Sequence, residues 1–483
     1  MACTTILVGK NASYDGSTMV ARNEDSPAGE FTPKEFIVVK PEDHPIKYKS
    51  IISKVEISLP ENPMRYTLMP DAKRDKGIWG GCGVNEKNVS MTATETITSN
   101  ERVLSADPLV EGGIGEEDMV SLVLPYMTSA RDGAKRLGKL LEEYGTYEMN
   151  GIAFQDEDEI WWLETIGGHH WIAARLPDDC YAVIPNQLGI DYFDLEDALG
   201  EQKEFMCSSD LKSFIDDNFL DLSIDEEYLN TRYAFGSYSD SDHTYNTPRA
   251  WVLQRFFNPN TNIWDGIDAD FRPDSDDIPW CRLPEKKITV EDVKRALSNH
   301  FQGTPYDPYA KHGDLSYKGS FRPIGVNRTN FLAMVQIRPY VPEAIKCVEW
   351  VAFGSNVFNA FVPFYVNIND TPDYMKTGDK VSTDEFYWTN RLIGALSNAS
   401  FAACAGFVER YQMKLQSEGH AIIKKYDAKI KAQKMAYEAA TKVCEEANRE
   451  IAEIAKKETD QLLADVLYQA SCEMKNGFAR SDA

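Results

Sequence analysis

Cys3-Thr4-Thr5-Ile6-Leu7-Val8-Gly9 and, after it, Thr18-Met19-Val20-Ala21-Arg22-Asn23-Glu24-Asp25 are the stretches that decide how this chain folds. Both are rich in β-branched and apolar residues, and the residues between them include asparagine, serine, aspartate and glycine, which favour turns. We therefore predict an antiparallel hairpin of two strands. Pairing Gly9 with Thr18 would place Cys3 opposite residues 22–24, so that a thiol lies beside an arginine, an asparagine and carboxylates.

Three interpretations of Cys3 are open on the residue alone. It is a small buried residue at the start of a strand, an exposed thiol without a role, or a nucleophile. The third interpretation needs Met1 and Ala2 to be removed. An α-amine has an unperturbed pKa of about 7.7, so the freed amine of Cys3 could then act as the base for its own thiol. Most cysteines are inert, so the residue taken alone favours the first interpretation.

The neighbours of Cys3 change this balance. Cys3 at the start of a strand, followed by Arg22-Asn23-Glu24-Asp25, resembles the start of the N-terminal-nucleophile hydrolases. The chain is similar to the dipeptidase branch of the cysteine-nucleophile peptidases of lactic acid bacteria, the dipeptidase A group. Penicillin V acylase and bile salt hydrolase are more distant and share the cysteine and the Arg-Asn-x-Asp pattern. The resemblance covers residues 3 to about 400 and implies an α+β fold, a four-layer αββα sandwich. One difference is Ala2, which makes a cut between Ala2 and Cys3 necessary.

The resemblance implies roles for four residues of a catalytic centre. Cys3 is the nucleophile, Arg22 lies close to its sulfur and favours the thiolate, and Asp25 orients the α-amine. Asn186 follows the strand predicted at 181–185 and would donate its amide to the oxyanion hole, although an asparagine in such a place is most often a turn residue. This chemistry needs no cofactor.

Three further charged residues are candidates for the site. Arg249 stands in the first turn of a predicted helix, where the helix dipole disfavours a cation, so we expect it to have an anionic partner. The matching arginine of the acylases lies by the catalytic centre, and here it is also a candidate for binding the carboxylate of a dipeptide. Glu24 and Glu95 are expected to receive the ammonium group of the substrate.

Two other segments invite a functional interpretation. Residues 112–118, Gly-Gly-Ile-Gly-Glu-Glu-Asp, begin a predicted helix; the three acids suit the helix dipole but would repel a phosphate, so we reject a phosphate loop. Residues 186–290 are predicted to be acidic and irregular. Within them Asp240, Asp242 and His243 lack the spacing of an EF-hand, so we expect these three side chains to be solvated.

Composition limits the partners and the compartment. The chain has 483 residues and a net charge of −25, which makes nucleic acid and anionic membrane surfaces poor partners. Its nine cysteines form no C-x-x-C pair, so we expect a reducing cytoplasm rather than a disulfide framework. There is no His-Glu-x-x-His motif, no apolar run of about 18 residues and no secretory signal pattern, so neither a metal nor a spanning helix is expected.

The order of predicted elements suggests one large domain and a tail. A hairpin is predicted at 78–95, a four-stranded meander at 151–185, and a strand at an edge or bend at 357–366. Helices follow from about residue 383, and one of them has an apolar stripe at Tyr437, Ala440, Cys444, Ala447, Ile451 and Ile454. We divide the chain into a removable segment 1–2, a hydrolase domain 3–400 and a helical tail 401–483. The tail is a packing or association element, and we expect a homo-oligomer.

These features predict a cytoplasmic cysteine dipeptidase that hydrolyses a range of free dipeptides through a thioester. One alternative is an acylase of non-peptide amides, of the penicillin V or bile salt type. Another alternative is a binding or scaffold protein that is never processed and is catalytically silent.

Overall fold

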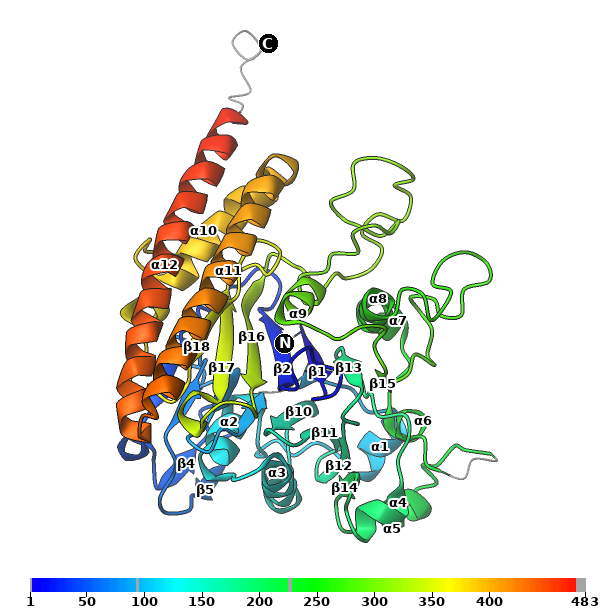
Figure 1. Ribbon diagram of the computed structural model, residues 1–483. Coiled ribbons are helices and arrows are strands. Elements are labelled where there is room, and N and C mark those ends of the chain that lie inside the picture. The colour runs from blue at the N-terminus through cyan, green and yellow to red at the C-terminus, as the bar shows by residue number, and fades with distance from the viewer. Residues whose placement is uncertain (1, 93–94, 225–227, 475–483) are drawn as a thin grey trace.

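The computed structural model describes residues 2–92, 95–224 and 228–474 of the chain. Helices and antiparallel strands are mixed along the sequence, and the long helices are at its C-terminal end (Figure 1). The predicted α+β class is therefore confirmed. Strands from residues 2–25 and from residues 329–365 lie in one sheet, so the two ends of the predicted hydrolase domain meet.

The first large sheet is entirely antiparallel. It contains the predicted hairpin at its centre and has the strand order β15-β13-β1-β2-β16-β17-β18. Its strands are β1 (Ala2–Val8), β2 (Thr18–Asp25), β13 (Tyr181–Ile184), β15 (Cys281–Arg282), β16 (Thr329–Ile337), β17 (Cys347–Phe353) and β18 (Val362–Tyr365).

The second large sheet has the strand order β14-β12-β11-β10-β8-β7, and β9 also pairs with β10. Its strands are β7 (Cys82–Val84), β8 (Ser90–Thr92), β9 (Glu95–Thr96), β10 (Asn150–Gln155), β11 (Ile160–Ile166), β12 (His170–Arg175) and β14 (Phe205–Cys207). Two short ladders join β3 (Ile37–Val39) to β6 (Tyr66–Leu68) and β4 (Lys47–Lys49) to β5 (Glu56–Ser58).

The helices fall into groups along the chain. Those before residue 300 are α1 (Glu101–Ala106), α2 (Glu116–Val123), α3 (Ala130–Tyr144), α4 (Leu195–Leu199), α5 (Leu211–Asp217), α6 (Thr231–Phe235), α7 (Asp240–Tyr245), α8 (Thr247–Phe257) and α9 (Val290–Ala296). The C-terminal group is α10 (Phe386–Ala399), α11 (Phe401–Gln433) and α12 (Tyr437–Cys472), and short 3-10 turns are η1 (Pro41–Asp43), η2 (Leu124–Tyr126), η3 (Glu343–Ile345) and η4 (Asp373–Met375).

The register of the first hairpin is the one that the turn predicts. Cys3 pairs with Glu24, and Ala2 pairs with Asp25. Side chains alternate between the two faces of a strand, so Cys3 lies on the same face as Leu7, which belongs to an apolar cluster built from both large sheets. The nucleophile candidate therefore faces the space between the two sheets.

Two elements differ from the sequence prediction. The first three strands of the predicted meander form β10, β11 and β12, but β13 leaves this sheet and pairs with β1, so that Thr5 is opposite Ile184. The strand that carries Asn186 at its end is thus brought next to Cys3. The segment 186–290 contains the helix predicted around Arg249, which is α8, but its remainder, predicted to be irregular, also contains α4 to α7, because local capping and burial organise a sequence without clear periodicity.

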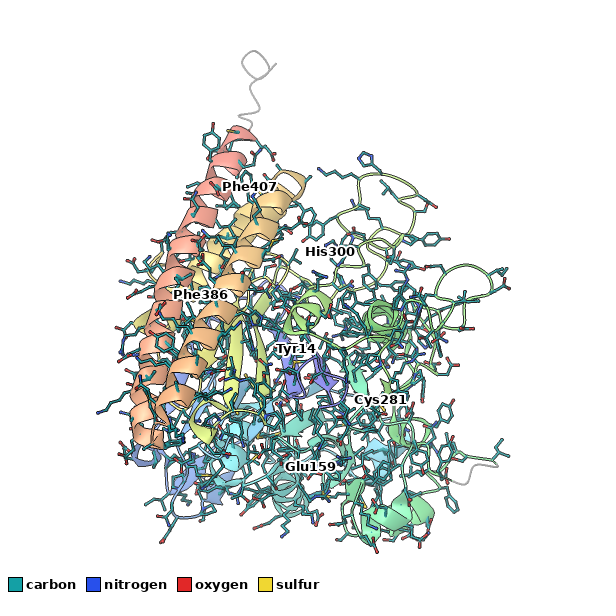
Figure 2. All side chains as sticks on the ribbon, viewed as in Figure 1. Tyr14, Glu159, Cys281, His300, Phe386 and Phe407 are labelled. Atoms are coloured by element: carbon teal, nitrogen blue, oxygen red, sulfur yellow. The ribbon has the colours of Figure 1, made fainter. Side chains whose placement is uncertain are left out.

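Each large sheet also packs on helices. One apolar cluster combines residues of the first sheet with residues of α8 to α12, among them Phe386, which is labelled in Figure 2. Another combines residues of the second sheet with residues of α2 and α3. Burial of apolar surface on both faces holds the two sheets in place, and it fixes the hairpin that carries Cys3.

The C-terminal helices cover the edge of the first sheet. Figure 1 shows α11 and α12 side by side along β17 and β18. Asn448 of α12 accepts from the backbone N–H of Tyr365 at 2.9 Å and donates to its carbonyl at 2.9 Å, so it satisfies the edge strand β18. The edge position predicted for this strand is confirmed. The predicted stripe is buried at Ala440, Cys444, Ala447 and Ile451, whereas Tyr437 is exposed and Ile454 is partly buried.

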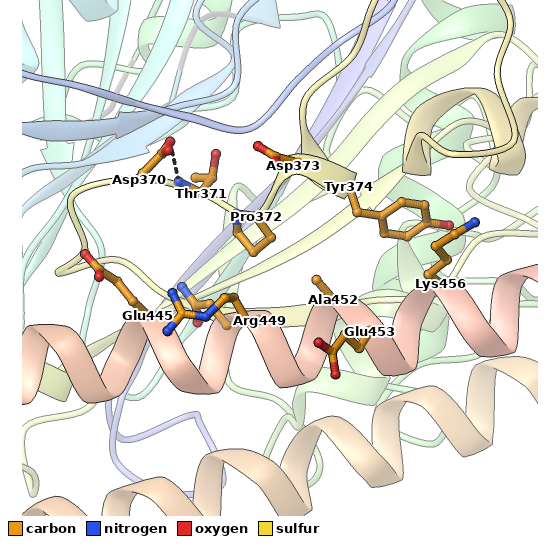
Figure 3. A pocket seen from close by; sticks show the side chains of 11 residues that line it. Asp370, Thr371, Pro372, Asp373, Tyr374, Glu445, Arg449, Ala452, Glu453 and Lys456 are labelled. Carbon is orange, nitrogen blue, oxygen red and sulfur yellow. Dashed lines mark hydrogen bonds between the residues drawn. The ribbon is translucent and has the colours of Figure 1, made fainter.

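A cavity of about 350 Å³, lined mostly by polar and charged residues, lies between α12 and the segment 370–374 (Figure 3). Glu445 and Glu453 lie on either side of Arg449 along α12, and Nζ of Lys456 is 5.5 Å from the centre of the Tyr374 ring. The cavity contains none of the predicted site residues. In the part of the chain that the structure describes, no helix combines the length and the apolar character needed to cross a bilayer.

Candidate active site

The thiol of Cys3 lies against the guanidinium of Arg22. Cys3 is fully buried, and Nη2 of Arg22 is 2.8 Å from its sulfur. The same Nη2 atom donates to Oε1 of Glu116 at 2.7 Å. A guanidinium in hydrogen-bond contact with a sulfur stabilises the thiolate form of a cysteine, which is the nucleophilic form. The hairpin register therefore produces a contact that activates a thiol.

Asn186 contacts the backbone of the same cysteine. The side-chain oxygen of Asn186 accepts from the backbone nitrogen of Cys3 at 3.1 Å and from Nη2 of Arg249 at 2.7 Å. Its own carbonyl accepts from Asn246 at 3.0 Å. Because Oδ1 receives both donors, the amide orientation is fixed, and Nδ2 is the atom of this side chain that can donate to a reacting oxygen.

Arg249 is buried in the first turn of α8 and crosslinks the site. Its Nη1 donates to the carbonyl oxygen of Cys3 and, at 2.8 Å, to the hydroxyl of Thr4. Its Nε donates to the carbonyl of Tyr245 at 2.7 Å, and its Nη2 donates to Asn246 at 2.7 Å as well as to Asn186. Each of the five N–H groups of Arg249 thus donates to a neutral acceptor. The dipole argument from the sequence had instead led us to expect an anionic partner for this arginine. The geometry supports positioning of Cys3 and Asn186 rather than binding of a substrate carboxylate.

Asp25 is fully buried on the opposite face of β2 from Arg22. It accepts from the hydroxyl of Thr329 at 2.6 Å and pairs with Nη2 of Arg322. Burial lowers the pKa of Arg322, but the charges and hydrogen bonds of Asp25 and Tyr245 together outweigh this effect, and the pKa of Arg322 is raised. The role of Asp25 in orienting an α-amine stays a prediction.

Glu24 lies on the inner face but has an internal partner. The ammonium of Lys34, which is completely buried, is 2.7 Å from Glu24 and 2.7 Å from Asp71. Burial raises the pKa of Asp71 to about 6. A lysine shared by two buried carboxylates neutralises much of their charge, so this geometry does not support Glu24 as the acceptor of a substrate ammonium.

Glu95 begins β9, which pairs with β10, and its side chain lies outside the described part of the structure. The roles predicted for Glu95 therefore stay predictions. In the ranges that the structure describes, no group of three His, Cys, Asp or Glu residues has the arrangement of a metal site.

The sequence interpretation missed several residues that shape the site. Asp242, predicted to be solvated, is buried and accepts from Nδ2 of Asn246 at 2.5 Å. It thereby holds Asn246, which in turn contacts Asn186 and Arg249. That prediction was wrong because Asp242 is the third residue of a short helix, where it closes a capping box with Ser239. Glu116 could have been noticed from the sequence, because it is one of three acids at the start of a predicted helix. No sequence pattern singles out Arg322 or Lys34.

Comparison with known proteins identifies the class. The model of peptidase family C69 matches residues 2–414, and the chain belongs to this family. The chain is 53% identical to "Dipeptidase" of Bifidobacterium longum and 53% identical to "Probable dipeptidase A" of Streptococcus pyogenes, with both chains covered completely in each case. It is 44% identical to "Probable dipeptidase B" of Lactococcus lactis over all of this chain and 98% of the relative. The resemblance inferred from the first 25 residues is confirmed.

Proposed function

We propose that this protein is a cysteine dipeptidase in which Cys3, freed of Met1 and Ala2, attacks the peptide bond of free dipeptides. Family membership and the dipeptidase names of full-length relatives support the activity. The observation that carries the mechanism is the contact of the Cys3 sulfur with Arg22 together with the contact of the Cys3 nitrogen with Asn186. One residue then supplies the nucleophile and the base.

The first half of the reaction forms a thioester. The α-amine of Cys3 takes the thiol proton, and the sulfur forms a bond to the scissile carbonyl carbon. Nδ2 of Asn186 and backbone N–H groups stabilise the oxyanion. When the intermediate collapses, the carbon–nitrogen bond breaks, and the α-ammonium of Cys3 gives its proton to the leaving amine.

The second half releases the remaining amino acid. The α-amine deprotonates a water molecule, which attacks the thioester carbonyl, and the carbon–sulfur bond breaks as the thiol regains its proton. The contact at 3.1 Å between the Cys3 nitrogen and Oδ1 of Asn186 supports a refined role for the asparagine. After processing, the same oxygen would hold the free amine, and Asp25 would assist from the adjacent pair of the ladder.

The fold and the chain division fit this proposal. Two antiparallel sheets, with helices packed on each, support the αββα sandwich of the N-terminal-nucleophile hydrolases. We propose a removable segment 1–2, a hydrolase domain 3–400 and a tail 401–483 that packs on β18. Nine free thiols support a reducing cytoplasm as the site of action. The homo-oligomer stays a prediction.

Parallel assays separate the dipeptidase from the acylase alternative. The processed enzyme should hydrolyse alanyl-alanine and leucyl-glycine with a kcat/KM at least about 100-fold higher than for penicillin V or a glycine-conjugated bile acid, since a polar site rejects substrates that leave its charges unpaired. Release of free amino acid is measured for each substrate at equal enzyme concentration. Comparable or faster cleavage of the non-peptide amides would overturn the dipeptidase assignment in favour of the acylase.

A further inference from the structure

One carboxylate oxygen of Glu116, beside the Cys3 thiol and Arg22, receives no hydrogen bond from the described residues. Glu116 is the first residue of α2, it is only 1% exposed, and its Oε1 receives the Arg22 Nη2 that also contacts the Cys3 sulfur. Its other oxygen, Oε2, is buried and has no hydrogen-bond partner among the residues that the structure describes. A buried carboxylate oxygen without a donor is costly, which favours a ligand that donates to it.

The two neighbouring acids in the same helix turn are different. Glu117 accepts from Ser50 at 3.0 Å with Oε1 and from Tyr147 at 2.6 Å with Oε2. Asp118 accepts from Tyr48 at 2.7 Å and from the N–H of Gly115 at 3.2 Å. Both therefore have internal donors on each oxygen. Among these three acids, only Glu116 has an oxygen left for a ligand within the described structure.

A second carboxylate lies beside Glu116. Glu148, between α3 and β10, accepts from the backbone N–H of Glu116 at 2.7 Å. Burial, and then the charge of Glu116, raise the pKa of Glu148 to about 7. The guanidinium of Arg22 pairs with Glu116 at 2.7 Å, and Glu148 adds a second carboxylate beside that pair. A second cation placed between the two carboxylates would stabilise the ionised form of both.

The position of Glu116 fits the geometry of a dipeptide. In a peptide, the α-nitrogen of the first residue is about 2.5 Å from its carbonyl carbon, given the bond lengths and angle of the backbone. A nucleophile attacks from roughly 3–3.5 Å. The ammonium group of a dipeptide must therefore lie close to the Cys3 sulfur during attack, and Glu116 is joined to that sulfur by a single Arg22 nitrogen.

We propose that Oε2 of Glu116 and the carboxylate of Glu148 bind the α-ammonium group of the dipeptide substrate. This subsite rests on the proposed dipeptidase function and takes over the role that the sequence suggested for Glu24. It makes a free N-terminus a requirement, because a substrate without the ammonium leaves Oε2 of Glu116 without a donor and adds no cation beside Glu148. It also fixes the scissile carbonyl over the sulfur, because the ammonium is bonded to the adjacent carbon.

The test compares two ligands that are identical except that one carries the α-ammonium group and the other lacks it. Alanyl-alanine is the substrate, and propionyl-alanine, which lacks only the amino group, is measured as a competitive inhibitor. Glu148→Gln keeps the oxygen that accepts from Glu116 but removes the charge. We expect it to raise KM for alanyl-alanine about 10- to 100-fold and to leave the Ki of propionyl-alanine within about threefold. Glu116→Gln should show the same selectivity change together with a lower kcat, because it also removes the charged partner of Arg22.

Glu117→Gln is the matched control, because it removes a neighbouring charge whose oxygens have internal donors. It should leave the ratio of KM to Ki unchanged. If Glu148→Gln and Glu116→Gln shift both constants equally, or neither, the ammonium subsite is refuted while the dipeptidase function stands. Failure of the processed wild-type enzyme to hydrolyse any free dipeptide would instead refute the proposed function. Thermal melting of each variant shows that the comparison is made between folded proteins.

Discussion

Cys3→Ala should abolish dipeptide hydrolysis, with a decrease in kcat of more than about 10⁴-fold, because the residue supplies both the nucleophile and, after processing, the base. Cys3→Ser should also lose nearly all activity, since an alcohol ionises far less readily than a thiol. Initial rates with a saturating free dipeptide measure both effects. The buried contacts of Arg22 and Arg249 with Cys3 are the reason why we expect this thiol, among nine, to be the reactive one.

The matched control is Cys180→Ser, which changes a half-buried cysteine in the segment between β12 and β13. It should retain wild-type turnover. If Cys180→Ser matched the effect of Cys3→Ala, or if Cys3→Ala retained substantial activity, the nucleophile would be a different residue.

Asn186 variants should show the second largest effect. Asn186→Ala should lower kcat by about 10²–10³ if Nδ2 donates to the oxyanion, with a much smaller change in KM. It should also lower the free energy of unfolding by about 1–3 kcal/mol, because the buried Nη2 of Arg249 loses an acceptor. Single-turnover kinetics and urea denaturation measure the two quantities separately.

Asn186→Asp separates catalysis from scaffolding. The aspartate keeps an oxygen for Arg249 and for the Cys3 nitrogen, so folding stability should be retained, but it has no N–H to donate. Its kcat should therefore fall as in Asn186→Ala. Wild-type turnover in Asn186→Asp would restrict Asn186 to a structural role.

Local patterns made much of the fold predictable. The hairpin register follows from one turn, because the numbers of paired residues have a constant sum in an antiparallel ladder. In the structure Cys3 is opposite Glu24, within the predicted range 22–24. The apolar stripe of α12 follows from helical periodicity, and Pro363 indicated the edge strand β18. These features depend on residues close together in the sequence, where spacing alone decides which side chains share a face.

The parts of the site that the sequence did not reveal depend on distant segments. Arg322 forms a buried ion pair with Asp25, and Lys34 forms one with Glu24. Residues of these four types usually lie at the surface, so the sequence gives no sign that these are buried. β13 pairs with β1 and not with the other strands of the predicted meander, and this choice depends on the packing of both sheets. Glu24 was assigned to the substrate because a carboxylate beside a thiol looks unpaired until the position of Lys34 is known.

The N-terminal residue of the active enzyme tests the central claim most directly. In the structure, Ala2 pairs with Asp25 in the ladder, and the Cys3 nitrogen is a peptide N–H that cannot accept a proton from the thiol. Intact-mass measurement and N-terminal sequencing of material purified by its dipeptidase activity should return a chain that begins at Cys3. An active chain that begins at Met1 or Ala2 would contradict the mechanism, because its base would still be tied in a peptide bond.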